Sequence, residues 1–105
     1  MPADLHFEGD LGIAVATDTR QRWLTWLAEH PAPTGPDAAP VRLDLSATTG
    51  CDSAGVQLLL ALGHSLAQRG QQLALHHPPE AVNEVLGRFG LHGHWPVSHD
   101  EEPTP

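Results

Sequence analysis

Apolar and polar residues alternate in the sequence VRLDLS, residues 41–46, and this period of two predicts a strand with one buried face. Residues 53–69 then carry apolar side chains at helical spacing, which predicts a helix that is covered on most sides. Gly70 is expected to end that helix, because glycine adopts positive φ without a steric penalty. The expected apolar face comprises Val56, Leu59, Leu60, Gly63, Leu66 and Ala67, widened by Leu58 and Leu62.

The chain before this strand predicts two elements and a connection. Residues 5–9, LHFEG, alternate in polarity and predict a short edge strand, after which Gly9-Asp10 favours a turn. Residues 13–29 predict a helix. Residues 31–40 are rich in proline, which lacks an N–H and fixes φ, so this segment is expected to be an exposed connection. The expected apolar face of the first helix comprises Ile13, Ala16, Trp23, Leu24 and Leu27.

The chain after Gly70 predicts one more strand and one more helix. The strand is QLALHH, residues 72–77, and the helix is PPEAVNEVLGRFG, residues 78–90, with Pro79 in its first turn. Residues 96–105 are expected to be an acidic flexible tail after a single domain over residues 1–95. This alternation of strands and helices predicts an α/β fold. The shared strand face is Leu73 and Leu75, and the helix face is Val82, Val85, Leu86 and Phe89.

The composition narrows the classes of partner. Among its 105 residues the chain has five arginines, no lysine and a net charge of −8, which disfavours nucleic acid and anionic membranes and favours partners with basic patches. A single cysteine, Cys51, rules out an internal disulfide. The start, MPADLHFEGD, does not have the pattern of a secretory signal, and no apolar run is long enough to span a bilayer. We therefore expect a cytoplasmic protein without direct membrane insertion.

The joint between the central strand and helix, Ser46 to Gly55, carries the candidate chemistry. Asp52 can cap the helix by accepting from its free N–H groups, with Ser53 one position further on. Gly55 removes bulk, so that another molecule can approach the helix start. Either these residues only cap the helix, or Ser53 is an exposed hydroxyl that a partner recognises or modifies. A phosphate there would be tolerated by the helix amides but not by a partner packed on the loop.

Catalytic interpretations of this joint are weaker. A hydrolase nucleophile elbow needs G-x-S-x-G, and Gly50 lies one residue too far from Ser53. A phosphate-binding loop needs a lysine, which the chain lacks. Cys51 precedes a helix, which lowers a thiol pKa, but the adjacent Asp52 raises it, so a small buried residue at the end of the strand is the favoured interpretation.

The histidines are candidate metal ligands, and the tryptophans are candidate contact residues for a partner. Zinc could be held by the pair His92 and His94 with His99 nearby, whereas His76 and His77, adjacent on a strand, are expected to point to opposite faces. The alternative is that these imidazoles are solvated or half-buried. Trp23 falls on the core face of its helix, while Trp26 and Trp95 are either exposed contact residues or packed beneath the proline-rich connection.

Residues 41–91 resemble a STAS domain, the sulphate-transporter and anti-sigma-factor-antagonist family. The features that carry the resemblance occur in order: the strand LDLS, then DSAG, an apolar helix, RG before a strand, and a helix ending in FGL. The earlier stretch EGDLGIAVATDTRQRWL resembles the first strand-to-helix region of the family. The resemblance implies a small mixed sheet of four or five strands with helices mainly on one face.

The resemblance also implies a function. In standalone members the serine or threonine after the aspartate is phosphorylated by a serine kinase that is also an anti-sigma factor, and Ser53 stands at that position next to Asp52. Such a domain switches partners, catalyses nothing and needs no cofactor. The alternative is an MlaB-like subunit that docks on the ATPase of an ABC-type lipid transporter. The implied contact surface is Asp52, Ser53, Ala54, Gly55, Val56 and Gln57.

Overall fold

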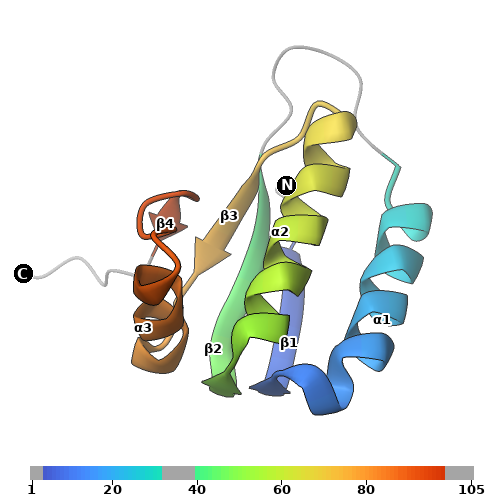
Figure 1. Ribbon diagram of the computed structural model, residues 1–105. Coiled ribbons are helices and arrows are strands. Elements are labelled where there is room, and N and C mark those ends of the chain that lie inside the picture. The colour runs from blue at the N-terminus through green and yellow to red at the C-terminus, as the bar shows by residue number, and fades with distance from the viewer. Residues whose placement is uncertain (1–3, 32–39, 99–105) are drawn as a thin grey trace, which may run out of the picture.

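The structure is a computed structural model that describes residues 4–31 and 40–98. Strands and helices alternate along the chain, and the prediction of an α/β fold is confirmed (Figure 1). Most of the proline-rich connection and residues 99–105 of the expected tail lie outside the described residues. The elements are β1 (Asp4–Leu11), a 3-10 turn η1 (Ile13–Val15), α1 (Ala16–Glu29), β2 (Val41–Cys51), α2 (Ser53–Gln68), β3 (Leu73–His76), α3 (Glu80–Arg88) and β4 (Val97–Ser98).

The sheet has the order β1-β2-β3-β4, and its three described pairings are all parallel, where a mixed sheet was expected. The sequence patterns did not reveal β4, because a strand of two residues is too short to show an alternation. Its place is fixed by backbone bonds, in which the N–H of Leu75 donates to Pro96 at 2.8 Å and that of His77 to Ser98 at 2.8 Å. β4 therefore forms one edge of the sheet at the start of the segment expected to be a tail.

The three α-helices pack on the same face of the sheet, with α2 between α1 and α3 (Figure 1). The alternation predicted for β2 is confirmed, since Val41, Leu43 and Leu45 are fully buried beneath the helices. α2 is the most apolar of the described α-helices, and its buried side chains complete one continuous core. The polar side chains of β1 and β2 alternate onto the opposite face of the sheet. This two-layer arrangement places the carboxyl ends of the first two strands beside the start of α2.

Two strands are longer than expected. The turn predicted at Gly9-Asp10 is wrong, because β1 continues through these residues to Leu11. The register against β2 shifts twice, once on each side of Glu8-Gly9, and Gly9 has a φ of +97°. Such irregularities absorb a turn-like residue inside a strand. Likewise β2 runs on through the polar joint to Cys51, so only Asp52 separates the strand from α2.

Several residues predicted in the core are exposed. Ile13 belongs to a 3-10 turn, so the helical phase that linked it to the buried face of α1 does not apply. Leu24, Leu60 and Ala67 lie at the margins of their helices' apolar faces, where no further layer covers them. Phe89 is the C-cap of α3 and projects beyond the last turn. As predicted, Gly70 has a positive φ just after α2, and Gly90 has a positive φ just after α3.

Candidate functional site

The candidate site lies where β1 and β2 end and α2 begins. Asp52 is the N-cap of α2, and its Oδ1 accepts a hydrogen bond from the backbone N–H of Gly55 at 3.1 Å. Its other oxygen, Oδ2, accepts from the backbone N–H of Ile13 at 3.1 Å. The backbone N–H of Asp52 donates to the carbonyl of Leu11 at 3.3 Å. One residue thus ties the start of α2 to the turn that follows β1.

These hydrogen bonds also fix the charge of Asp52. The backbone N–H of Ile13, followed by that of Gly55, lowers the pKa of the carboxyl below its ordinary value, against a weaker opposing effect of desolvation. The N–H of Ala54 lowers this pKa further. The side chain is exposed, so Asp52 presents a carboxylate to solvent at the helix start.

Ser53 is the first residue of α2 and is exposed, as the sequence predicted for a reachable hydroxyl. The other residues of the implied contact surface differ in their exposure to solvent. Gln57 is exposed one turn further along, and Ala54 is half-buried. Gly55 and Val56 are buried and support the surface from beneath.

The reason for a glycine at position 55 differs from the one the sequence suggested. A Cβ at Gly55 would lie 2.2 Å from the carbonyl oxygen of Leu11 and 3.0 Å from Sγ of Cys51. The space that a side chain would need is therefore filled by β1 and β2. Gly55 allows α2 to start against the sheet, and it does not open the site to another molecule.

Ile13 also belongs to this site, which the sequence pattern did not predict. Its side chain is 78% exposed, and its backbone is held by Asp52. Gly12 is also fitted to the carboxylate, since a Cβ there would lie 2.8 Å from Oδ2 of Asp52. On the strand side, a Cβ at Gly50 would lie 2.9 Å from Oδ1 of Asp10. Gly12 and Gly50, which lie near Asp10 and Asp52 respectively in the sequence, were the only hint of these contacts in the sequence. Nothing in the sequence pattern indicated that these two segments lie together in the fold.

The family described as MlaB, STAS domain, matches residues 2–97. The chain belongs to the STAS domain family. No curated protein matches the sequence. Most STAS domains are non-enzymatic binding modules.

Solved structures of STAS proteins share the fold. A candidate anti-sigma factor antagonist from Thermotoga maritima has a TM-score of 0.68 at 22% identity, covering 90% of this chain and 76% of its own. The anti-sigma factor antagonist SpoIIAA in its unphosphorylated form has a TM-score of 0.69 at 19% identity, covering 94% and 79%. A sulfate transporter family protein from Wolinella succinogenes has a TM-score of 0.66 at 20% identity, covering 91% and 75%. The α/β fold of this STAS domain is thus shared with these proteins.

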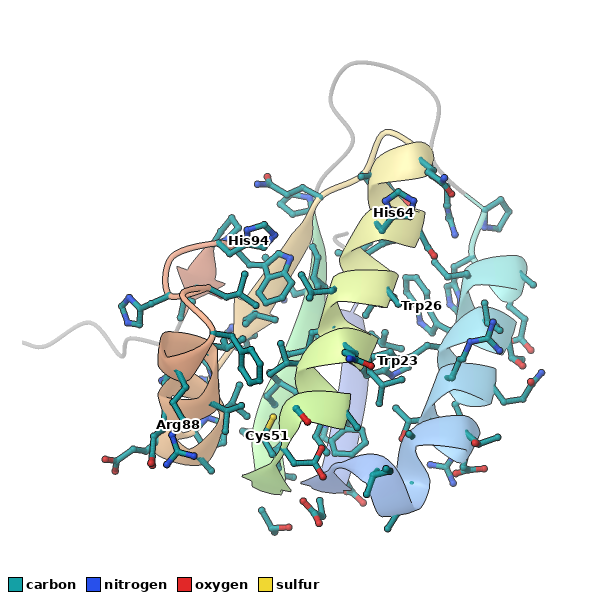
Figure 2. The ribbon with its side chains drawn as sticks, in the orientation of Figure 1. Trp23, Trp26, Cys51, His64, Arg88 and His94 are labelled. Atoms are coloured by element: carbon teal, nitrogen blue, oxygen red, sulfur yellow. The ribbon has the colours of Figure 1, made fainter. Side chains whose placement is uncertain are left out.

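Cys51 is the last residue of β2 and lies near the start of α2 (Figure 2). Burial raises the pKa of its thiol to about 11, with further contributions from the negative charges of Asp52 and Asp10. The thiol is half-buried and lies 3.6 Å from the carbonyl oxygen of Asp52. A protonated thiol is a poor nucleophile, so this geometry favours the structural interpretation.

The histidines of the STAS domain do not gather into a metal site among the residues that the structure describes. The prediction that His76 and His77 point apart is wrong, because the strand ends at His76 and His77 has a φ of +54°. Their rings meet edge to face with centroids 4.4 Å apart. The rings of His94 and Trp95 also meet edge to face, with centroids 4.7 Å apart. His99 lies outside the described residues.

Two of the three tryptophans are core residues. Trp23 is buried as predicted, and Trp95 is 7% exposed, so it packs in the core and is not an exposed contact residue. Trp95 fits against α2 because position 63 is glycine, whose Cβ would lie 3.0 Å from the indole nitrogen. Trp26 is half-buried and stacks on His30. Within residues 4–31 and 40–98, every helix is too short or too polar to cross a membrane.

Proposed function

We propose that this STAS domain is a regulatory binding module that switches partners when Ser53 is phosphorylated. The observation that carries the proposal is that Ser53 is exposed at the first position of α2, directly after a carboxylate that is itself held by two backbone N–H groups. The unphosphorylated domain binds a serine kinase that is also an anti-sigma-like factor. The phosphorylated domain releases that partner. The domain itself catalyses nothing and works in the cytoplasm.

The physical basis of the switch is a difference between the free and bound states. In the free domain, a phosphate at Ser53 is stabilised by the helix dipole and remains solvated, so the fold persists. In the complex, the partner would desolvate that phosphate beside the Asp52 carboxylate and the apolar side chain of Ile13. Burying two neighbouring negative charges is costly, so phosphorylation weakens the complex and leaves the domain folded.

The family description supports a second candidate function. The matching family is described as MlaB, STAS domain. In that case the same surface of Asp52, Ser53, Gln57 and Ile13 docks on the ATPase subunit of an ABC-type lipid transporter, and no phosphorylation cycle is required. The two candidates differ in partner and in the effect of charge at position 53.

Affinity measurements with the purified partner test the switch. Ser53→Asp is expected to weaken binding by about tenfold or more, and Ser53→Ala is expected to bind like the unmodified chain. Gln72→Glu adds the same charge at an exposed position beyond the far end of α2 and should leave affinity unchanged. Co-purification with the tagged chain identifies the partner as a kinase or an ATPase subunit. Equal affinities for Ser53→Asp and Ser53→Ala would overturn the switch.

A further inference from the structure

The outer edge of β1 has the features of a second docking site. β1 has eight residues and pairs only with β2 among the described strands, whereas the other edge strand, β4, has two residues. Proteins commonly protect edge strands by shortening or covering them, since alternate N–H and C=O groups along a free edge can pair with another chain. Within residues 4–31 and 40–98, no other segment pairs with the outer edge of residues 5–8.

A groove runs beside this edge. Its one wall is residues 5–8 of β1, and its other wall is the side of α1 formed by Thr19, Arg22, Trp23 and Trp26. The groove has a volume of about 350 Å³. A segment bound in this groove would therefore contact the edge of β1 and the side of α1 together.

The helical wall is largely aromatic and is held in place. Trp23 meets Phe7 edge to face, with ring centroids 6.4 Å apart and planes at 72°. Trp26 is stacked on His30 with centroids 4.4 Å apart. Figure 2 shows both tryptophans on the side of α1 that faces the rest of the domain. These contacts fix apolar surface next to the free strand edge, where the side chains of an added strand would fall.

We propose that this groove binds an extended, basic segment of a partner protein, which adds to the sheet beside β1. Main-chain hydrogen bonds to the edge supply affinity, and every second side chain of the segment, being apolar, enters the groove against Trp23 and Trp26. The intervening side chains lie on the open face of the sheet, and these are lysine or arginine.

Charge selects this occupant. On the open face His6 lies 3.4 Å from Glu8 and 3.8 Å from Asp44, so its imidazole is already shared by two carboxylates, and the Glu8 side chain is 76% exposed. The one arginine of the groove, Arg22, is paired with Asp18 at 3.1 Å. A second copy of this chain would bring another net charge of −8 and another acidic β1 edge. Like charges on paired strands are destabilising, so a basic strand of a different protein fits and a β1–β1 dimer does not.

This inference does not depend on the proposed switch. The groove lies between α1 and β1 and includes none of the residues from Asp52 to Gln57. A partner could hold the edge of β1 through one segment while its folded body reaches the start of α2. A change at Ser53 that abolishes partner binding there would leave the groove beside β1 intact. Likewise, a change in the groove would leave the surface around Ser53 intact.

The test uses the full chain, labelled with ¹⁵N, and a capped peptide of about eight residues in which valine alternates with lysine. The expected result is saturable shifts of the backbone amides of residues 5–8 and of the Trp26 indole N–H, with a dissociation constant below about 1 mM. A valine–glutamate peptide of the same length is the charge control and should bind at least about tenfold more weakly.

N-methylated peptides separate strand addition from simple charge attraction. In a strand all valine N–H groups point to one side and all lysine N–H groups to the other. Methylating one of these two sets should therefore abolish binding, and methylating the other should preserve it. Equal binding of both methylated peptides, or no saturable shift with the unmethylated one, would overturn the proposal.

Two variants locate the site. Trp26→Ala is expected to weaken peptide binding by about tenfold, while Leu24→Ala, an exposed residue of α1 outside this groove, leaves it unchanged. Glu8→Lys keeps the core intact and should reverse the preference between the lysine and glutamate peptides. Unchanged selectivity in Glu8→Lys would contradict the site even if Trp26→Ala failed to fold.

Discussion

Asp52 uses both oxygens of its carboxylate, one for the N–H of Gly55 in its own helix and one for the N–H of Ile13 after β1. The first bond is local and satisfies a helix N–H that has no partner within the helix. The second joins residues far apart in the chain and holds the backbone of the exposed Ile13 at the residue that precedes Ser53. A single side chain therefore sets both the start of α2 and the shape of the contact surface.

Replacing this carboxylate tests its structural role. In Asp52→Asn one oxygen remains, so one of the two backbone bonds is lost and the thermal midpoint should fall by a few degrees at neutral pH. Because the pKa of Asp52 is lowered by folding, its stabilisation is present above the ordinary carboxyl pKa and is lost as pH falls through the folded-state pKa. Midpoints measured against pH should therefore converge for the two proteins in acid. A difference that persists unchanged at low pH would contradict this role.

Gly55 provides a second test at the scale of one residue. Gly55→Ala places a Cβ 2.2 Å from a backbone oxygen of β1, so we expect a loss of about 2 kcal/mol or more in the free energy of unfolding. Gly87→Ala is the matched control, because it lies inside α3 with nothing within 4 Å of the new Cβ. That variant should gain about 0.5–1 kcal/mol. Denaturant unfolding of both proteins checks the pair, and a neutral Gly55→Ala would refute the packing explanation.

At the scale of single residues, the sequence predicted those features that depend on interactions between neighbours in the chain. The cap at Asp52 and the exposed Ser53 were predicted, because capping depends on residues within one turn. The contribution of Ile13 and the true reason for Gly55 were not predicted. Both depend on contacts of the start of α2 with segments far away in the chain, namely the turn η1 for Ile13 and the end of β1 for Gly55.

Arg69, the C-cap of α2, joins the far ends of two helices. Its guanidinium donates to the backbone carbonyl of Leu27 at 3.0 Å and to that of His30. These carbonyls lie at the end of α1, where helix C=O groups have no partner within the helix. The cation also complements the negative end of the α1 dipole. Arg69 thus joins the carboxyl-terminal ends of α1 and α2. At the other end, Asp52 joins the start of α2 to the turn η1 that precedes α1.

Arg69→Ala is expected to lower the free energy of unfolding by about 2 kcal/mol, because two charge-assisted hydrogen bonds are lost. Arg88→Ala removes an exposed arginine whose one partner among the described residues is Glu84 in the same helix, so its cost should be below about 0.5 kcal/mol. Chemical unfolding of the two variants gives the comparison. Similar losses in both would show that Arg69 does not connect the helices.

The elements themselves were predicted better than their ends. Period-two and helical spacing located three of the four strands and all three α-helices of the part of the chain that the structure describes. The irregular pairing of β1 with β2 concealed the length of both strands, since a register shift interrupts the alternation on which the prediction rests. The buried face of α1 was partly misassigned because the chain enters it through a 3-10 turn.

The whole molecule carries a net charge of −8 without a single lysine, so a partner of either proposed contact surface meets a strongly acidic protein. The α/β class and the placement of the helices on one face followed from alternation and from the STAS resemblance. The groove beside β1 could not be foreseen, because it exists only where a free strand edge and two tryptophans of α1 meet.

Charge at this scale predicts how association depends on salt. The rate of association with a basic partner should fall about tenfold or more between low and high ionic strength, while the rate of dissociation changes little. Stopped-flow or surface-binding kinetics over a salt series distinguish the two rates. An association rate that is independent of salt would show that complementary charge does not guide the encounter.

The central claim is that phosphate on Ser53 and bound partner exclude one another. The most direct measurement is phosphopeptide mass spectrometry of the native protein after separation into partner-bound and free fractions. We expect phosphorylated Ser53 in the free fraction and unmodified Ser53 in the bound fraction. Equal phosphorylation of Ser53 in both fractions, or none in either, would contradict the account.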